Sequence, residues 1–190
     1  MPWRRLIPAL LLAIVLVADL LLHVLDPPYP ALGLLDEPAH LATAAVVLLA
    51  LSVHDRTFAA ATLVAALALD LDHLPHELGV DLLTQHTTRP VTHSLAGLVL
   101  VVAAVAAVSR RRMVTAGVAC GIAAHLFRDL GTGGGVPLFW PQTFRAVEIP
   151  YVVYAVVLGA MGARACSIDS RIAWKRRGQK QPSSSTPQRT

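Results

Sequence analysis

The chain has 190 residues, of which 55% are hydrophobic and 15% are charged, and its formal net charge at pH 7 is +4. The apolar residues form long blocks instead of amphipathic stripes, which excludes a soluble globular domain of this size. A positive charge is common in nucleic-acid-binding proteins, but the positions of the basic residues, given below, argue against a nucleic acid partner.

Six apolar blocks are long enough, or nearly so, to cross a membrane as helices. A helix needs about 17–25 apolar residues to cross a hydrocarbon core of roughly 30 Å. The sequence therefore predicts an all-α fold, a polytopic membrane helical bundle with about six transmembrane helices. In chain order, the predicted spans are Leu6–Leu25, Pro38–Val53, Thr57–His76, Thr92–Ser109, Met113–Leu130 and Ile149–Cys166.

The first block has two interpretations. Arg4 and Arg5 followed by an apolar run are also the form of a secretory signal peptide. The run is long and no small-x-small cleavage site follows it, so a retained helix is favoured. The next loop lies on the outer side in either case.

The basic residues predict the orientation of the bundle. Thirteen of the 16 Lys and Arg residues lie near the two chain ends and in the turns after the second and fourth spans. With six spans, these positions share one side of the membrane, and the positive-inside rule makes that side the cytoplasm. Both termini of an inner-membrane protein are therefore predicted to be inside (N-in/C-in).

The chain divides into a membrane-embedded domain, residues 1–167, and a tail, residues 168–190. The tail is basic and its end is rich in Gln, Ser, Pro and Thr. This composition predicts a disordered cytoplasmic segment.

Seven of the eight histidines lie toward the predicted outer face, where three aspartates accompany them at helix ends. His125 and Asp129 are spaced i, i+4, and Asp70 and His73 are spaced i, i+3, so each pair projects from one face of a helix. Imidazole and carboxylate are ligand types of zinc, manganese and iron. The sequence therefore predicts a metal centre with these ligands: His40, Asp70, Asp72, His73, His93, His125 and Asp129.

Four histidines and three aspartates exceed the roughly three protein ligands of one catalytic zinc. We therefore expect two divalent ions about 3.5–4 Å apart, with zinc as the first choice and manganese or iron as alternatives. The helix dipole supports a cation here. Asp70, Asp72 and Asp129 stand at predicted helix C-termini, where carboxylates are otherwise unfavourable.

Each candidate also has a structural interpretation. A single histidine at a helix end is commonly an interfacial residue, and Asp129 before Gly131 also fits a plain glycine-capped helix end. Asp19 and His23, spaced i, i+4, are either a buried polar pair between helices or part of the site. The remaining polar residues fit structural roles: a capping hydroxyl at Ser94 and solvated loop imidazoles at His76 and His86.

Three segments carry the candidates in order: Asp70-Leu-Asp-His73, Arg89-Pro-Val-Thr-His-Ser-Leu95, and His125-Leu-Phe-Arg-Asp129 followed by Gly135-Val-Pro-Leu-Phe-Trp-Pro141. They resemble the YdjM-like family of inner-membrane proteins, which has Pro-Asp-Ile-Asp-His, His-Arg-Gly-x-Thr-His-Ser-Leu and His-x3-Asp segments, the last followed by Gly-Val-Pro-Leu-Leu-Trp-Pro. The resemblance covers roughly residues 40–150 and matches an earlier family histidine to His40. It implies metal-dependent hydrolysis, with a ligand pattern similar to that of zinc phospholipase C and related nucleases.

The chain departs from the family pattern at three positions. Leu69 replaces a proline, Thr88 replaces the first histidine of the second motif, and Pro90 replaces its glycine. His86, two residues before Thr88, is a candidate to compensate for the lost imidazole. The resemblance therefore supports the seven predicted ligands better than the first half of the second motif.

The leading hypothesis is a metal-dependent hydrolase that cleaves a phosphoester of a membrane lipid at the outer leaflet, using metal-activated water. Asp72 and Arg128 are the candidate catalytic residues, Asp72 as a ligand or bridging carboxylate and Arg128 as a cation for the phosphate. Arg89 and Arg145 lie on the same face and could also hold the headgroup. Interfacial snorkelling is the alternative role of all three arginines.

The alternative hypothesis is a non-catalytic metal-binding membrane protein. It would be a metal or proton carrier, or a regulator that binds a partner through its basic tail. A carrier should place ionisable residues along a path near mid-membrane. Only Asp19 and Cys120 lie deeper than the helix ends, which favours a site over a pathway.

The predicted orientation can be tested with reporter fusions. A fusion at Gly178 is expected to report a cytoplasmic location and a fusion at Gly134 an extracytoplasmic one, because 13 of the 16 basic residues then obey the positive-inside rule. Paired phosphatase and fluorescent-protein reporters distinguish the two sides. The reverse pattern would overturn both the orientation and the outer location of the site.

Overall fold

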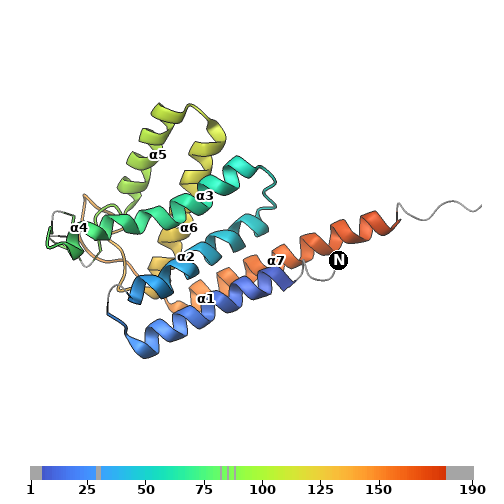
Figure 1. Cartoon of the computed structure of the whole chain (residues 1–190), viewed down its shortest axis with the longest axis horizontal. Helices are drawn as coiled ribbons and strands as arrows, with labels where there is room; N and C mark the ends of the chain where they lie inside the picture. Colours follow the sequence, from blue (N-terminus) through green and yellow to red (C-terminus); the bar gives the residue numbers. More distant parts are fainter. Residues whose placement is uncertain (1–5, 29–30, 82, 85, 88, 179–190) are drawn as a thin grey trace, which may run out of the picture.

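The computed structural model describes residues 6–28, 31–81, 83–84, 86–87 and 89–178, with the backbone alone for Glu77 and residues 169–178. This part of the chain is all-helical, as predicted, apart from an isolated bridge between Val136 and Val147. The helices, labelled in Figure 1 where there is room, are α1 (Leu6–Leu25), α2 (Ala31–Ala50), α3 (Arg56–Ala68), the 3-10 helix η2 (Leu69–His73), α4 (Leu74–Glu77), α5 (Leu95–Ser109), α6 (Arg112–Thr132) and α7 (Tyr151–Gly178).

Five helical segments of the described chain are long and apolar enough to cross a membrane. A sixth helix, α5, is apolar but has only 15 residues. At 1.5 Å per residue it is about 23 Å long, which is short for a hydrocarbon core of roughly 30 Å. The polytopic bundle is confirmed, and the predicted fourth span is a shorter helix than expected. The spans are Leu6–Leu25, Ala31–Ala50, Arg56–His76, Arg112–Thr132 and Tyr151–Ile168.

Helix α2 begins seven residues before the span predicted to start at Pro38, so that boundary is wrong. Pro38 lies inside the helix and leaves the Leu34 carbonyl without its usual intrahelical donor, which is why proline normally indicates a helix start. The earlier start has a consequence for the site. Asp36 lies on the same helix as His40, one turn before it.

The predicted third span, Thr57–His76, changes pitch where its aspartates begin. α3 ends at Ala68, η2 follows for five residues, and α4 adds a last α-helical turn. A 3-10 helix has three residues per turn, so Asp70 and His73 lie on one side of η2. The predicted helix is therefore present but tightened at the candidate site.

Helix α5 begins at Leu95, so the predicted start at Thr92 is wrong. Ser94 has an extended backbone, and its hydroxyl oxygen accepts a hydrogen bond from the Gly97 N–H at 3.0 Å. This is an N-cap, and the capping role predicted for Ser94 is confirmed. His93 therefore precedes the helix instead of lying in its first turn.

Helix α7 continues to Gly178, beyond the predicted span end at Cys166 and the predicted domain boundary at residues 167 and 168. Residues 168–178 are therefore helical and not disordered. They contain good helix formers such as Arg, Lys and Ala, and glycine occurs only at the end. The rest of the predicted tail, residues 179–190, lies outside the described residues.

Two glycines bring α3 and α6 into close contact. A Cβ atom added at Gly117 would lie 2.5 Å from the Phe58 carbonyl oxygen, and one added at Gly121 would lie 2.9 Å from the Ala65 Cβ. Both distances are shorter than ordinary Cβ contacts, so only glycine permits this approach. The Thr62 hydroxyl joins the helices by donating to the Gly117 carbonyl at 3.0 Å. Small residues with interhelical hydrogen bonds are a common way to pair helices in lipid.

Helices α1, α2 and α7 pack around Tyr154. Its side chain is fully buried with Val15 and Val46, and its hydroxyl lies 3.2 Å from the Thr43 hydroxyl. Gly131 near the end of α6 lies against the same ring, since an added Cβ would approach the Tyr154 Cβ to 2.5 Å. These contacts fix the ends of α2, α6 and α7 relative to one another.

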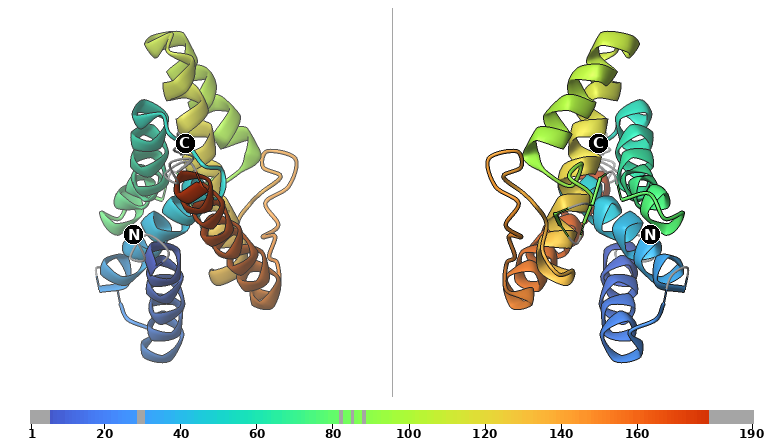
Figure 2. Two further views of the ribbon diagram at one scale, coloured as in Figure 1. Left: turned by 90° about the vertical axis from the view of Figure 1, so that its right-hand side faces the viewer. Right: turned by 90° about the vertical axis from the view of Figure 1, so that its left-hand side faces the viewer.

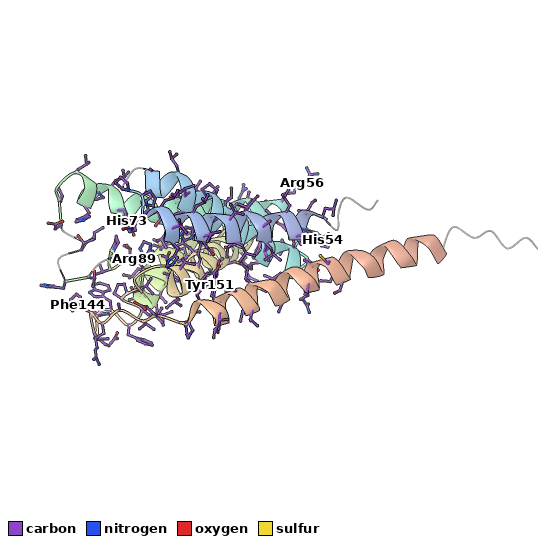
Figure 3. All side chains as sticks on the ribbon, turned by 90° about the horizontal axis from the view of Figure 1, so that it is seen from below. His54, Arg56, His73, Arg89, Phe144 and Tyr151 are labelled. Atoms are coloured by element: carbon purple, nitrogen blue, oxygen red, sulfur yellow. The ribbon has the colours of Figure 1, made fainter. Side chains whose placement is uncertain are left out.

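The helix ends that carry the candidate residues gather at one end of the bundle. Figure 3 shows His73 and Arg89 at this end and His54 and Arg56 at the opposite end. In end-on views, the α5–α6 hairpin and α1 lie on opposite sides, with α3 on one flank and the connection after α6 on the other (Figure 2). α2 and α6 run through the middle, where they hold the polar side chains.

The close contact between α3 and α6 predicts that a larger side chain at Gly121 destabilises the protein. Gly121→Val should lower stability by roughly 1–3 kcal/mol, because the new side chain forces α6 away from the α3 backbone. Thermal unfolding of the detergent-solubilised protein measures the change. Gly159→Ala is the control, since a Cβ at Gly159 meets no atom within 4 Å. Equal unfolding temperatures for the two variants would contradict this packing.

Candidate metal centre

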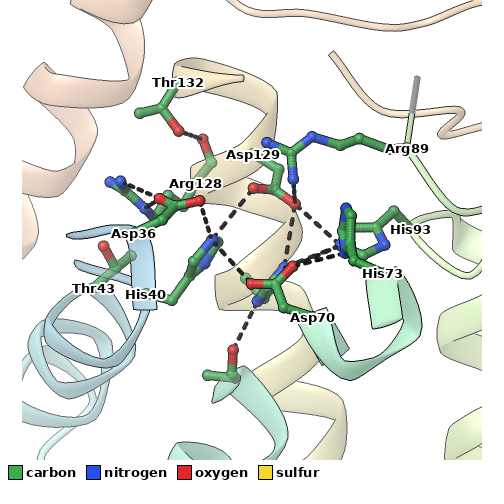
Figure 4. A network of polar contacts seen from close by, with 12 residues as sticks. Asp36, His40, Thr43, Asp70, His73, Arg89, His93, Arg128, Asp129 and Thr132 are labelled. Atoms are coloured by element: carbon green, nitrogen blue, oxygen red, sulfur yellow. Dashed lines mark hydrogen bonds and ion pairs between the residues drawn. The ribbon is translucent and has the colours of Figure 1, made fainter. Parts of the chain in front are cut away.

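Four histidines and three aspartates meet at one end of the bundle and form what we call the His/Asp cluster. Its members come from α2, η2, the segment before α5, and the end of α6. Figure 4 shows the Asp70 and Asp129 carboxylates in the middle, with His40 on one side and His73 and His93 on the other. The structure thus brings together all seven residues selected from the sequence: His40, Asp70, Asp72, His73, His93, His125 and Asp129.

One half of the cluster is fully buried. Ligand atoms of His40, His125 and Asp129 lie within 4.8 Å of one another, and none of the three side chains is exposed. Asp129 Oδ1 lies 3.4 Å from His40 Nε2, and Asp129 Oδ2 lies 3.2 Å from His125 Nε2. The end of α6 is capped by Gly133, whose N–H donates to the Asp129 carbonyl, while the Asp129 carboxylate lies in the cluster.

The other half of the cluster is partly open. Ligand atoms of Asp70, His73 and His93 also lie within 4.8 Å of one another. Asp70 Oδ1 lies 3.4 Å from both His73 Nδ1 and His93 Nε2, and Asp72 Oδ1 lies 3.1 Å from His73 Nδ1. The His73 side chain is 25% exposed, so a small molecule can approach from this side.

Asp70 and Asp129 connect the two halves. Asp70 Oδ1 lies 3.4 Å from His125 Nε2 in the buried half, and Asp129 Oδ2 lies 3.4 Å from His93 Nε2 in the open half. The His93 and His125 Nε2 atoms are themselves 3.2 Å apart. Two carboxylates between two sets of imidazoles are the arrangement that a pair of bridged metal ions requires.

The hydrogen bonding and the spacing of the ligand atoms indicate whether a metal ion fits the cluster. Eight buried side-chain atoms in the described part of the chain make no hydrogen bond of good geometry, and seven belong to the cluster, where Asp129 Oδ2 has an ion pair with Arg89. Leaving such a group unpaired costs roughly 1–3 kcal/mol, so their concentration calls for a compensating cation. Two atoms that each lie about 2.0–2.2 Å from a tetrahedral metal are about 3.3–3.6 Å apart. The N···O distances in the cluster, 3.1–3.7 Å, match that spacing.

Neighbouring groups orient two of the imidazoles toward the cluster. His125 Nδ1 lies 2.7 Å from the Ala66 carbonyl oxygen, so it carries the proton and leaves Nε2 free to ligate. His93 Nδ1 lies 3.3 Å from Asp72 Oδ2, which also accepts a hydrogen bond from the Thr92 hydroxyl. Both rings therefore direct Nε2 at the shared carboxylates.

The carboxylates favour positive charge at this position. Burial alone would lower the pKa of His93, but the carboxylates of Asp70 and Asp72 outweigh burial and raise the pKa of His93 above its usual value. The same field that favours a proton on His93 also favours a metal cation between the carboxylates.

Arg89 contacts the cluster directly. Its Nη1 lies 3.0 Å from Asp129 Oδ2, as Figure 4 shows. The guanidinium also lies against the backbone of Gly133, where an added Cβ would lie 3.0 Å from the Arg89 Cζ. Arg89 is therefore the arginine at this end of the described bundle whose guanidinium contacts a carboxylate of the cluster.

Arg128 does not face the cluster in the same way. Its Nη1 donates to Asp19 at 2.5 Å, its Nη2 donates to Asp36 at 2.7 Å, and the side chain is fully buried. The Tyr151 hydroxyl donates to the other Asp19 oxygen at 3.1 Å. Two carboxylates occupy the guanidinium, so direct phosphate binding by Arg128 does not fit this geometry. Arg128 instead ties together the ends of α1, α2 and α6.

Asp36 is the residue that the sequence analysis missed. Its Oδ2 lies 3.5 Å from His40 Nε2, while its Oδ1 accepts from Arg128. It therefore connects the cluster to the buried arginine. Its i, i+4 spacing to His40 was a usable signal, but Pro38 between them indicated that the helix starts later.

The remaining polar candidates lie outside the two ligand groups. Asp19 is a buried polar residue between helices, but its partners are Arg128 and Tyr151 and not His23. The exposed His76 pairs with Asp81 at 2.5 Å, and the exposed His86 ring packs edge-on against Phe144. His86 therefore does not supply the imidazole missing at Thr88, which itself lies outside the described residues. Arg145 is exposed on the connection after α6.

The cluster predicts the metal content of the purified protein. The wild type should bind two divalent ions per chain, and His125→Ala should lose at least one, because His125 belongs to the fully buried half. His76→Ala is the control, since this exposed histidine pairs only with Asp81 and Thr84. Elemental analysis by mass spectrometry gives the stoichiometry. Equal metal content in both variants and the wild type would contradict the assignment.

Comparison with known proteins agrees with this geometry. The model of the family described as YdjM inner membrane protein matches residues 36–181, a stretch that contains every member of the cluster and begins at Asp36. No match was found among curated proteins or solved structures. The family match covers more than half of the chain, and the chain therefore belongs to the family of YdjM inner membrane proteins.

Proposed function

We propose that the protein is a metal-dependent hydrolase that cleaves a phosphoester bond of a membrane lipid at the outer leaflet of the inner membrane. The observation that carries the proposal is the pair of adjoining ligand groups joined by Asp70 and Asp129. Two divalent ions, when bound there, supply an activated water and neutralise phosphate oxygens. Zinc suits this mixture of imidazole and carboxylate, and manganese and iron also accept it.

The two halves of the cluster have different roles in the proposed reaction. The buried half, formed by His40, His125 and Asp129, has no exposed side chain. Water is therefore excluded from this side of the cluster. The open half presents Asp72, whose buried Oδ1 accepts no hydrogen bond of good geometry and lies 3.1 Å from His73 Nδ1. Asp72 is therefore our candidate to accept or hold a proton near the reacting water.

Arg89 is our candidate to orient the phosphate. One nitrogen contacts Asp129, and the described residues provide no hydrogen-bond partner for its Nε and Nη2. A guanidinium with free donors suits the planar recognition of phosphate oxygens. This assignment replaces Arg128, whose donors are taken up by Asp19 and Asp36.

The membrane location supports a lipid as the substrate. The cluster lies toward one end of the spans, since Asp70 and Asp129 are within six residues of the ends of theirs, while His40 lies midway along α2. The basic turns at Arg56 and Arg110–Arg112 lie at the opposite end of the helices, which supports an outer location of the cluster under the positive-inside rule.

The proposal predicts chelator-sensitive hydrolysis that depends on the cluster. Purified protein in mixed micelles should release phosphate or a phosphorylated headgroup from lipid monoesters or diesters, and a chelator should stop the release. His125→Ala and Asp129→Ala should each lower the rate by at least about 100-fold while the proteins remain folded, because loss of a ligand disturbs the metal that activates water. The readout is product formation by mass spectrometry.

The control for these variants is again His76→Ala, which should retain the wild-type rate because this histidine pairs with Asp81 away from the cluster. Activity that resists chelation would contradict the metal mechanism. Stable metal binding without turnover of any phosphoester would favour the non-catalytic alternative, a metal-binding carrier or regulator.

A further inference from the structure

A large cavity lies beside the His/Asp cluster and plays no part in metal ligation. Its volume is about 920 Å³, which is in the range of pockets that bind whole small molecules. Its walls come from α1, the start of α2, the end of α6 and the start of α7. The cavity therefore opens between helices that face the lipid.

One wall of the cavity is a single face of α1. Leu16, Asp19, Leu20 and His23 line it, and these positions follow helical spacing. Leu16 is nine residues from the end of α1 at Leu25, so the cavity extends roughly 14 Å below the helix end. A cavity of that depth within an apolar span accommodates hydrocarbon and not only a water-soluble group.

The opposite wall of the cavity borders the cluster. Arg89 and Asp36 line the cavity, and they lie 3.0 Å from Asp129 and 3.5 Å from His40, respectively. Gly133 and Gly134 complete this wall: the guanidinium lies against the backbone of Gly133, and open space remains at the Cβ position of Gly134. The polar end of the cavity therefore adjoins the metal ligands.

The charges of the polar end select the orientation of a ligand. The Asp19 and Asp36 carboxylates both pair with the buried Arg128, whose single charge offsets one of the two, and Asp26 is a third carboxylate that lines the cavity. Arg89 is the arginine among the residues that line the cavity, and its Nε and Nη2 have no hydrogen-bond partner among the described residues. An anionic group can therefore bind at the remaining donors of Arg89, whereas Leu16 borders the apolar end of the cavity.

We propose that this cavity binds the lipid substrate itself, with one phosphate at Arg89 and an acyl chain along the Leu16–Leu20 face of α1. This inference rests on the proposed hydrolase function and specifies its substrate as a phosphate-bearing lipid that enters from the membrane. The lipid approaches between α1 and the end of α6, and its phosphate lies at Arg89, on the side of the cluster formed by His40 and Asp129.

The test measures binding to the metal-loaded, full-length protein. The probe is a diacyl phosphonate, an analogue of a phosphorylated lipid that cannot be hydrolysed, and the readout is the bound fraction by native mass spectrometry. Leu16→Trp should weaken binding about tenfold or more, because the indole fills the chain end of the cavity. Gly134→Leu should do the same at the polar end, where an added Cβ meets no protein atom within 4 Å and the fold is not disturbed.

Two matched variants control for general effects of bulk. Leu21→Trp places the same indole on an exposed position of α1 that does not line the cavity. Gly159→Leu adds the same side chain on α7, where a Cβ also meets no atom. Both should bind the phosphonate as the wild type does, and Leu16→Trp should leave the affinity for a water-soluble short-chain phosphonate unchanged.

The outcomes separate this inference from the proposed function. Wild-type affinity in Leu16→Trp and Gly134→Leu would overturn the cavity as the substrate site, even if the enzyme hydrolyses lipids. Equal binding of a diacylglycerol, which has no phosphate, would also overturn it, since the cavity would then hold bulk lipid only. The expected binding pattern without any turnover would support the cavity and reject the hydrolase.

Discussion

The contact between α3 and α6 is the constraint on which the metal centre depends. Gly117 and Gly121 let α6 approach the α3 backbone so closely that His125, the next residue on that face, reaches the Ala66 carbonyl. In lipid, little hydrophobic force acts between helices, so van der Waals contact and interhelical hydrogen bonds must hold them. The same contact fixes the distance between the carboxylates of α6 and η2, and with it the room for metal.

The distribution of charge explains why the two buried or half-buried arginines have different roles. Arg128 pairs with a carboxylate of α1 and one of α2, whose burial without a partner would be costly. Arg89 contacts one carboxylate of the cluster and leaves the others to imidazoles. The surplus of carboxylate over fixed positive charge therefore lies between the imidazoles of the cluster. A pair of divalent cations offsets that surplus with ligand atoms already spaced for them.

Helical periodicity made much of the site predictable. The pairs His125 with Asp129 and Asp70 with His73 lie on single helical segments, so their spacing determines that they share a face. Asp36 has the same relation to His40 and was missed, because Pro38 indicated a later helix start than the structure has. The local rule for proline was sound, but the packing of α2 against its neighbours outweighs the lost hydrogen bond.

Contacts between helices were harder to predict from the sequence. The approach of Arg89 to the end of α6 joins a loop to a helix 40 residues later, and no local pattern encodes that distance. One signal was available for Arg128, which directly precedes Asp129. Adjacent residues on an α-helix point about 100° apart, so a side chain next to a ligand faces away from the ligand's target. That geometry favours a supporting role for Arg128, as the structure has it.

The position of ionisable residues along the spans distinguishes a surface enzyme from a carrier. Between the cluster and the basic turns at the other end, α2, α3, α5 and α6 carry no charged side chain. Asp19, the deepest carboxylate, is held by Arg128 and Tyr151 and is therefore not free to relay ions. A carrier requires binding groups near mid-membrane that both sides can reach in turn. The described helices instead gather their polar groups toward one end, with His40 midway along α2, beside a cavity that extends along α1 to Leu16, and this arrangement favours a site over a path through the bundle.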